Sequence, residues 1–334
     1  MSSGMLFDNQ QQSWFASLLE DTQDLDRWLI FADWLEDHDH PQAEVTRLWA
    51  RQRWNPGQWR RDQEARLIAL LNEGLRPCLP RYVNSLGMSF VLVPKGSFWM
   101  SENGKNAQKP VRIDYDFYMG IYPVTQGQWQ EWMGENPSWF SRSGEGKDKV
   151  KDLPDTDLRY FPVEQVSWKE MQLFAKLLND RESVREKWKY GLPTEVEWEY
   201  SCREGASSKE ECSFDIYLTE RTDTLSSNLA NFKGDAPLGN APKGPILSRT
   251  TKVGTYPPNR LGIYDMHGNV RESCEDLFGE EFKGGSNRVF RGGSFYHDGS
   301  CCRVAYRFGC GSVISSSGLG FRIAMVPSER NPNK

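Results

Sequence analysis

Apolar residues recur at helical spacing through the first 80 residues of the chain. Between Leu25 and Leu35 they fall every three or four positions, which places them on one face of an amphipathic helix. Pro41 follows and is suited to open another helix. The same spacing predicts two further helices, with the apolar residues Val45, Leu48, Trp49 and Leu67, Leu70, Leu71. Residues 1–80 are therefore predicted to form a small helical module with a linker at its end.

From about Asn84 the pattern changes to short β-rich runs separated by long irregular stretches. One run covers residues 88–100 and is broken at Pro94 and Gly96, and a second covers residues 115–124. Such a mixture predicts an α+β domain, over residues 84–327, with much irregular structure.

Three helices within this domain are predicted from their N-terminal signals. Thr125 is a candidate N-cap for a helix over 126–133, and another helix begins after Ser167. Thr194 and Glu197 have the spacing of a capping box. The acidic residues after Thr194 are interpreted as helix capping and surface charge, in preference to an acid/base pair.

Residues 295–318 follow neither pattern. They lie between Arg-Gly-Gly-Ser at 291–294 and Leu-Gly-Phe-Arg-Ile-Ala at 319–324, which are typical of strand ends with tight turns. The segment contains no Lys, Glu, Gln, Met or Trp. Those types make up roughly a quarter of the other residues, so a random window of this length lacks them about one time in a thousand. Surface loops generally favour Lys, Glu and Gln, so an ordinary loop does not explain the bias.

The composition restricts the class of protein. The chain has 334 residues, a formal net charge of −5 and 26% charged residues, which fits one large or two ordinary soluble domains. No basic excess indicates nucleic-acid binding, and no run of about 20 apolar residues could span a membrane. The N-terminus lacks signal-peptide features, and the seven cysteines are odd in number and irregularly spaced. A cytoplasmic protein with reduced thiols is expected.

Residues 36–40 form an acidic and histidine-containing cluster between the first two predicted helices. Consecutive residues do not converge on one point, so an inter-helix loop is favoured over a metal site. The sequence from Asp24 to Gln52 resembles a short helical module found beside other domains in bacterial proteins; it reads DLDRWLIFADWLEDHDHPQAEVTRLWARQ. This resemblance implies a docking element with a protein partner.

Seven ordered motifs give the rest of the chain a second resemblance. They are FYMGIYPVTQGQW (117–129), FPVEQVSW (161–168), GLPTEVEWEYSCREG (191–205), LGNAPKGP (238–245), VGTYPPNRLGIYDMHGNVRE (253–272), RVFRGGSF (288–295) and GLGFR (318–322). Together they resemble the formylglycine-generating-enzyme, or sulfatase-modifying-factor, family. The resemblance implies an elaborated C-type-lectin-like α+β fold, which agrees with the strand and loop pattern, but a fold alone does not assign a function.

The family's enzymes use copper and O₂ held by two cysteines five residues apart, soon after the Gly-Gly-Ser turn. Here those positions are His297 and Cys302. Soft Cu(I) prefers a thiolate pair, so the replacement argues against oxidase activity. Cys301 is not expected to substitute, because adjacent side chains point apart in an extended segment. The alternative is a copper-dependent oxidase that uses Cys302 and His297, or an inactive relative of one.

The resemblance also implies calcium, because Asn231, Asn269 and Glu272 match positions where the family's oxygen ligands lie. The family's usual GNVWEW reads GNVRES here, with Arg271 and Ser273 in place of two aromatic residues. The competing interpretation is that Asn269 caps a turn through its side chain.

The five missing residue types are those that a codon ending in a pyrimidine cannot encode. Randomising only the adenines of AAC or AAT codons would produce this bias, which resembles the variable proteins of diversity-generating retroelements. A segment of this kind is predicted to bind a protein ligand on a surface that a rigid scaffold supports. The candidate ligand-binding residues are Phe295, Tyr296, His297, Asp298, Cys301, Tyr306, Phe308 and Cys310.

The same hypothesis makes a spatial prediction. A segment that accepts Phe, Asp, Cys or Gly interchangeably cannot fill a close-packed interior, where a change of even one methylene group alters stability. Residues 296–298, Tyr306 and Phe308 should therefore form one exposed patch, with Arg303, Ala305 and Arg307 as scaffold positions turned away from it.

Overall fold

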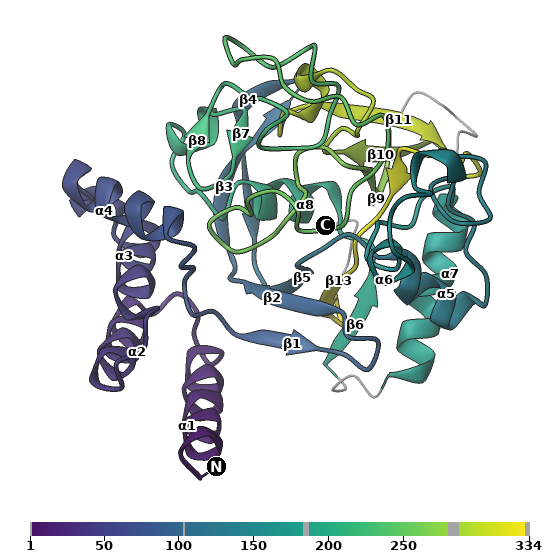
Figure 1. Cartoon of the computed structure of the whole chain (residues 1–334). Coiled ribbons are helices and arrows are strands. Elements are labelled where there is room, and N and C mark those ends of the chain that lie inside the picture. The colour runs from purple at the N-terminus through teal and green to yellow at the C-terminus, as the bar shows by residue number, and fades with distance from the viewer. Residues whose placement is uncertain (1, 103, 183–186, 280–286, 331–334) are drawn as a thin grey trace.

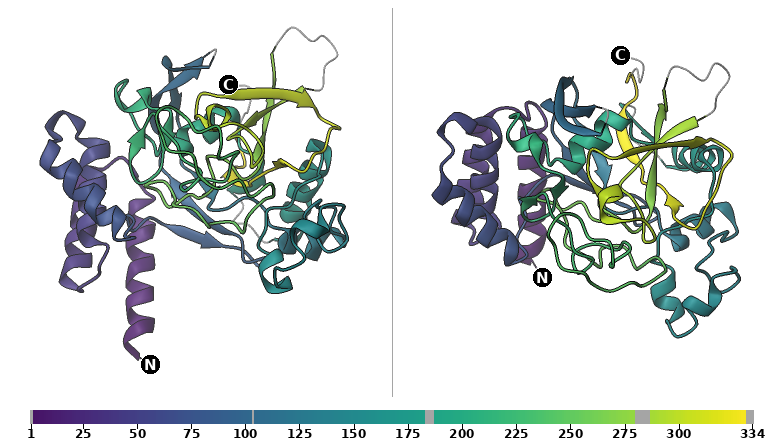
Figure 2. Two further views of the ribbon diagram at one scale, coloured as in Figure 1. Left: turned by 45° about the horizontal axis from the view of Figure 1, so that its top comes forward. Right: turned by 90° about the horizontal axis from the view of Figure 1, so that it is seen from above.

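The computed structural model describes residues 2–102, 104–182, 187–279 and 287–330. It has a helical N-terminal region at one side of a larger α+β body, and more helices at the opposite side of that body (Figures 1 and 2). The body contains several small sheets joined by long irregular stretches. The α+β class predicted from the sequence is confirmed.

Four helices form the N-terminal region: α1 (Ser2–Leu18), α2 (Leu25–Asp37), α3 (Ala43–Trp54) and α4 (Arg61–Asn72). The buried face predicted for α2 is present, and its Trp28 stacks on Trp54 with ring centroids 5.6 Å apart. Pro41 lies in the turn before α3, whose N-cap is Gln42, so it does not open the helix as predicted. Across the described part of the chain, no helix has both the length and the apolar character needed to cross a bilayer.

Five antiparallel strands form the larger sheet. Their order is β1 (Arg81–Val83), β2 (Ser89–Val93), β5 (Phe117–Gly120), β13 (Ala324–Pro327) and β6 (Trp188–Gly191). The C-terminal strand therefore lies between two strands from the first half of the body. Beside this sheet, α5 (Gln126–Met133) and α7 (Trp168–Arg181) enclose Phe321, which packs edge-on against Trp129 and Phe174.

A second sheet has the order β11 (Arg307–Gly311), β10 (Asn287–Arg291), β9 (Arg271–Leu277) and β12 (Leu319–Gly320). Its strands pair antiparallel except β12, which runs parallel to β9. Residues 295–318 leave β10, pass through a 3₁₀ turn at Gly299–Cys302 and return along β11 before they reach β12. The biased segment is thus loop, turn and edge strand, as predicted.

The remaining elements connect these sheets. They are β3 (Gly96–Glu102), β4 (Lys105–Ile113), β7 (Ile216–Tyr217), β8 (Arg221–Thr222), α6 (Asp155–Leu158), α8 (Glu195–Cys202) and short 3₁₀ turns at Pro56–Gln58, Lys147–Lys149 and Glu211–Ser213. The capping boxes at Thr125, Ser167 and Thr194 are all formed, which explains where α5, α7 and α8 begin.

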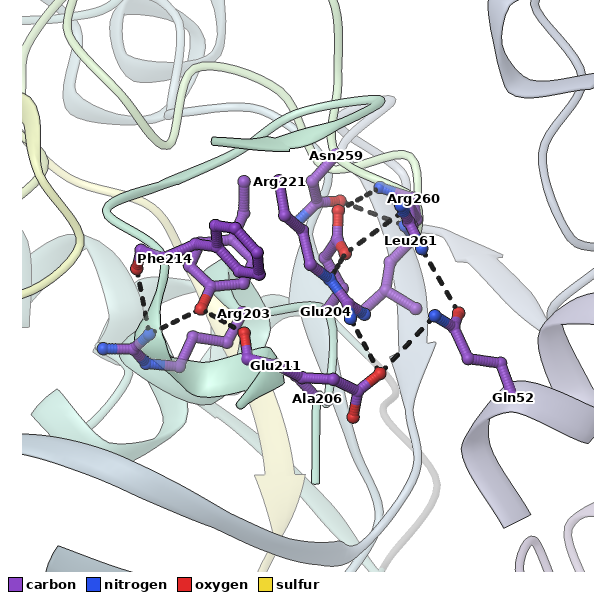
Figure 3. Close-up of polar contacts among 12 residues, drawn as sticks. Gln52, Arg203, Glu204, Ala206, Glu211, Phe214, Arg221, Asn259, Arg260 and Leu261 are labelled. Atoms are coloured by element: carbon purple, nitrogen blue, oxygen red, sulfur yellow. Dashed lines mark hydrogen bonds and ion pairs between the residues drawn. The ribbon is translucent and has the colours of Figure 1, made fainter. Parts of the chain in front are cut away.

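The N-terminal helices are joined to the body by buried polar contacts, shown in Figure 3. Gln52 of α3 accepts a hydrogen bond from Arg260 at 3.3 Å and donates one to Glu211 at 3.4 Å. Arg221 bridges Glu211 and Glu204, at 2.7 and 3.2 Å. Groups from α3, the turn after α8, the 3₁₀ turn at Glu211–Ser213, β8 and the loop at Arg260 therefore bind one another.

The acidic residues of α8 are buried, so their interpretation as surface charge was wrong. Glu195 is 7% exposed, and Glu197 and Glu199 are fully buried. Each carboxylate pairs with an arginine distant in sequence, namely Arg307, Arg330 and Arg291 in that order. Buried charges of this kind need such partners, because an unpaired charge in the interior is strongly unfavourable.

A fourth buried pair joins Glu272 of β9 to Arg322. Two N–H groups of Arg322 donate to the two carboxylate oxygens, at 2.6 and 2.5 Å, and the Trp198 indole donates to the same carboxylate at 2.7 Å. Both charged side chains are almost completely buried. The pair ties the second sheet to the segment that enters β13.

Replacing Arg322 by Leu is expected to lower the free energy of unfolding by about 3–5 kcal/mol, because Glu272 would remain buried without its counter-charge. Urea denaturation followed by circular dichroism measures this loss. Arg112→Leu is the matched control, since Arg112 pairs with Asp114 on the surface, where both side chains are about 70% exposed. The control should change stability by no more than about 0.5 kcal/mol. Equal losses in the two variants would show that the buried pair has no special role.

Candidate binding surface

A tight glycine turn sets the start of the biased segment. Gly292 and Gly293 follow β10 with φ angles of +89° and +73°, a region that L side chains rarely adopt. A Cβ atom on Gly293 would lie 2.7 Å from the Cys302 sulfur and 2.9 Å from the Cys301 carbonyl oxygen. The close approach of these two stretches therefore requires glycine at 293.

Several large side chains of the segment are exposed. Tyr296 is 41% and Phe308 is 40% exposed, and the neighbouring Val313 and Ile314 are 64% and 46% exposed. Asp298 is also exposed, and His297 and Tyr306 are half-buried. Surface segments are usually polar, so this number of exposed aromatic and aliphatic side chains in one segment is unusual.

Arg271, the first residue of β9, brings the exposed aromatic residues together. Its guanidinium donates to the Tyr296 hydroxyl at 2.9 Å and to the Ser316 hydroxyl at 3.3 Å. The same group lies 5.9 Å from the centre of the Tyr296 ring and 5.3 Å from that of Phe308. Tyr296, Phe308 and Ser316 therefore form one patch around Arg271, which we call the Arg271 surface.

His297 and Asp298 extend this surface. The His297 ring lies 4.4 Å from the Tyr296 ring, and its Nδ1 makes a 2.7 Å hydrogen bond with the Ser294 hydroxyl. Burial lowers the pKa of His297 to about 4, with a further lowering by the Arg271 charge, so the ring is neutral at pH 7. Asp298 pairs with Lys233 at 3.7 Å at the outer edge.

Tyr306 and Cys301 lie together on the next stretch. Burial raises the pKa of the Tyr306 hydroxyl, and the neighbouring Cys301 side chain adds to the rise. Both residues are half-buried. The Arg271 charge lowers the pKa values of both Tyr306 and His297, so both residues lie within electrostatic range of Arg271. Tyr306 is therefore at its margin, and Tyr296, Asp298 and Phe308 are the exposed members.

Two predicted surface residues lie elsewhere. Phe295 is only 6% exposed and packs edge-on against Phe140, with ring centroids 5.2 Å apart, so its place on the exposed surface was wrong. Cys310 is half-buried and packs against the hydrophobic cluster that contains Phe290. Composition did not separate these inward-facing positions from their exposed neighbours, because Phe and Cys occur at inward-facing and at outward-facing positions of the segment.

The three predicted scaffold residues contact the body of the protein on the inner side of the segment. Arg307 makes a two-pronged contact with Glu195, at 2.8 and 2.7 Å, and Ala305 is completely buried. Arg303 lies 3.6 Å from Asp215 and donates to the Ser300 carbonyl at 3.1 Å. On β11, Arg307 therefore faces the body while the next residue, Phe308, reaches the Arg271 surface.

The residues offered for copper do not form a thiolate pair. Cys302 is completely buried among apolar side chains, and burial raises the pKa of its thiol, so the thiol stays protonated. His297 is engaged by Ser294, and Cys301 lies with Cys302 on a 3₁₀ turn and not on the extended segment that was expected. In the described ranges no three His, Cys, Asp or Glu side chains gather as a metal site. These residues do not fit the family's copper chemistry.

The residues offered for calcium do not fit that ion either. The Asn269 side-chain oxygen accepts from Asn231 at 3.2 Å and from the Thr251 backbone at 3.0 Å. Asn269 has a φ of +64°, so the interpretation of this residue as a turn-former is the one that the geometry supports. The Glu272 carboxylate is already neutralised by Arg322. Calcium binding by other groups stays a prediction.

Sequence reasoning missed Arg271 as a member of this surface and did not single out Val313 and Ile314, which are exposed on the same segment. Arg271 had been noted as a departure from the family motif, and that departure was the available signal. Val and Ile can both be encoded by codons that end in a pyrimidine, so the two aliphatic residues could have been included on that ground.

Comparison with known proteins identifies the family and the fold of the chain. The family profile for the sulfatase-modifying factor enzyme 1-like domain matches residues 80–326. A solved structure, Treponema denticola variable protein 1, aligns with a TM-score of 0.54 and 24% identity, covering 74% of this chain and 99% of that one. That likeness concerns the fold alone.

Three curated relatives carry different names. Chaperone protein LppX of Paenibacillus barcinonensis is 28% identical over 74% of this chain and 91% of its own length. A formylglycine-generating enzyme of Streptomyces coelicolor is 33% identical over 49% of this chain and 52% of its own length. Inactive C-alpha-formylglycine-generating enzyme 2 of Bos taurus is 27% identical over 72% of this chain and 89% of its own length. The chain is thus similar both to a relative named as the enzyme and to one named as inactive. Because the family profile spans most of the chain, the protein belongs to the sulfatase-modifying factor enzyme 1-like family.

Proposed function

We propose that this chain is a non-catalytic binding protein that holds a protein ligand on the Arg271 surface. In this proposal it is the variable protein of a diversity-generating retroelement, and the outward-facing residues of 295–318 change between copies. The observation that carries the proposal is the group of exposed apolar side chains, Tyr296, Phe308, Val313 and Ile314, on a segment fixed from behind.

Exposed aromatic groups support a binding role. Tyr supplies large contact area at low conformational cost, and aromatic residues are enriched among the side chains that dominate protein interfaces. Contiguous exposed apolar groups are costly in a soluble protein unless a partner covers them. The Arg271 surface therefore has the composition of a protein-binding interface.

The arrangement of β11 supports diversification of this surface. Arg307 is fixed to Glu195, whereas the Phe308 ring is 40% exposed. Substitution at the exposed position changes what the surface presents without disturbing the ion pair beneath it. A relative of similar fold is named a variable protein, which is consistent with this role.

The enzyme alternative has weaker support in this chain. Copper chemistry of the family's kind needs an accessible thiolate pair, and Cys302 is a buried, protonated thiol with His297 at the partner position. All seven cysteines are free thiols, which suits a reducing compartment such as the cytoplasm. A protein partner for α1–α4 stays a prediction.

The chain is expected to show no formylglycine-generating activity. Incubation with Cu(I), O₂ and a cysteine-containing sulfatase peptide should leave the peptide mass unchanged, while a family enzyme with both cysteines serves as the positive control. Turnover that disappears in the Cys302→Ser variant would contradict the proposal and support an oxidase.

Two matched substitutions test the division between surface and support. Phe308→Ala should lower the free energy of unfolding by no more than about 1 kcal/mol, because the ring is partly exposed. Phe295→Ala should cost about 3–5 kcal/mol, because it empties a buried ring site beside Phe140. Chemical denaturation of both variants measures the difference. If Phe308 proves as costly as Phe295, the outward residues are packed structure and the display hypothesis is wrong.

A further inference from the structure

We infer that Arg271 is a constant anchor that binds a carboxylate of the protein ligand at the centre of the diversified surface. This inference rests on the proposed function and specifies its partner: a protein segment with an exposed Asp or Glu flanked by apolar residues. The carboxylate would lie against the guanidinium, with the rings of Tyr296 and Phe308 around it.

The position of Arg271 separates it from the residues that vary. It is the first residue of β9, outside 295–318, and its backbone pairs with Leu319 of β12. Its side chain nevertheless reaches Tyr296, Phe308 and Ser316, all within the biased segment. A fixed charge is thus surrounded by changeable neighbours.

The charge of Arg271 is not compensated within the described part of the chain. The other cations of this region have acidic partners: Arg303 lies 3.6 Å from Asp215, Arg307 pairs with Glu195 at 2.7 Å, and Lys233 lies 3.7 Å from Asp298. Within the described ranges, the side-chain hydrogen bonds of Arg271 go to the neutral hydroxyls of Tyr296 and Ser316. In this part of the chain Arg271 is therefore a cation of the surface with no acidic side chain that an external anion would have to displace.

Its hydrogen-bonding capacity is also incompletely used. A guanidinium has five N–H donors, and the Nε–H of Arg271 is buried without a hydrogen-bond partner in the described structure. This donor is enclosed by protein atoms, so a ligand would use the outer terminal nitrogens; both side-chain hydrogen bonds of Arg271 in the described structure come from one of the two. A carboxylate suits the planar fork better than a single hydroxyl does, because it can accept two parallel hydrogen bonds.

The surroundings favour a carboxylate on a protein over a small free anion. Tyr296 and Phe308 expose ring surface beside the charge, and such surface gains little from a hydrated ion. An acidic side chain flanked by apolar residues would use both features at once. Specificity between partners would then come from the changing neighbours, while Arg271 gives every copy the same point of attachment.

Selection from a random 12-residue peptide library against the full chain provides the probe. We expect the recovered peptides to share an Asp or Glu at one position, flanked by apolar residues. A synthetic peptide of this class should bind Arg271→Gln at least about tenfold more weakly than the unmodified chain, because a charge-assisted contact is lost. Replacing the shared Glu of the peptide by Gln should give a similar loss, which tests the contact without altering the protein.

Arg303→Gln is the matched control, because it removes the same charge from a side chain that already has Asp215 as a partner. It should change the affinity by less than about threefold, and thermal melting should confirm that both variants are folded. Peptides that need Phe308 but lack an acidic residue, or bind Arg271→Gln unchanged, would overturn the inference and leave the proposed function intact. Failure to recover any peptide whose binding falls in Phe308→Ser would contradict the proposed function itself.

Discussion

The pairing of arginine with glutamate beneath the second sheet is the interaction on which the Arg271 surface depends. Glu195 and Glu199 of α8 hold Arg307 and Arg291, which lie on the two adjacent strands β11 and β10. Glu272 of β9 holds Arg322 before the last strand. The charges on α8 are shared, because Glu195 also lies 3.3 Å from Arg291 and Glu199 also pairs with Arg203, so together these contacts restrict the sheet to one arrangement. The second sheet is therefore fixed from beneath by directional contacts that apolar packing alone would not supply.

This support explains how one short segment serves two purposes. Successive side chains of a strand point to opposite faces, so Arg307 reaches Glu195 while Phe308 remains at the surface. The turn at Gly293 brings the chain close to Cys302, which is buried where the family's enzymes need a reactive thiol. Cys302 is thus enclosed by apolar side chains on the inner side of the segment, and the exposed side carries aromatic and aliphatic groups.

Local signals in the sequence predicted local structure well. The helix starts at Thr125, Ser167 and Thr194 follow from residues within a few positions of one another. The burial of Glu199 was missed because its partner Arg291 is distant along the chain, and only the fold brings the two together. Composition identified the segment at 295–318 but not the direction of each side chain, so Phe295 was misplaced. Arg271 belongs to the surface through tertiary contact, which no pattern within the segment could indicate.

The most direct test of the central claim is the DNA that encodes residues 290–324, read in many sibling isolates together with its genomic surroundings. The account predicts a near-copy of this stretch beside a reverse transcriptase gene, with AAC or AAT where the two copies differ. Differences among isolates should fall at outward-facing codons such as those for Tyr296 and Phe308, and should spare Ala305 and Phe321, which are buried. Substitutions spread evenly over exposed and buried codons, with no adenine-based copy nearby, would contradict the claim that this surface is diversified.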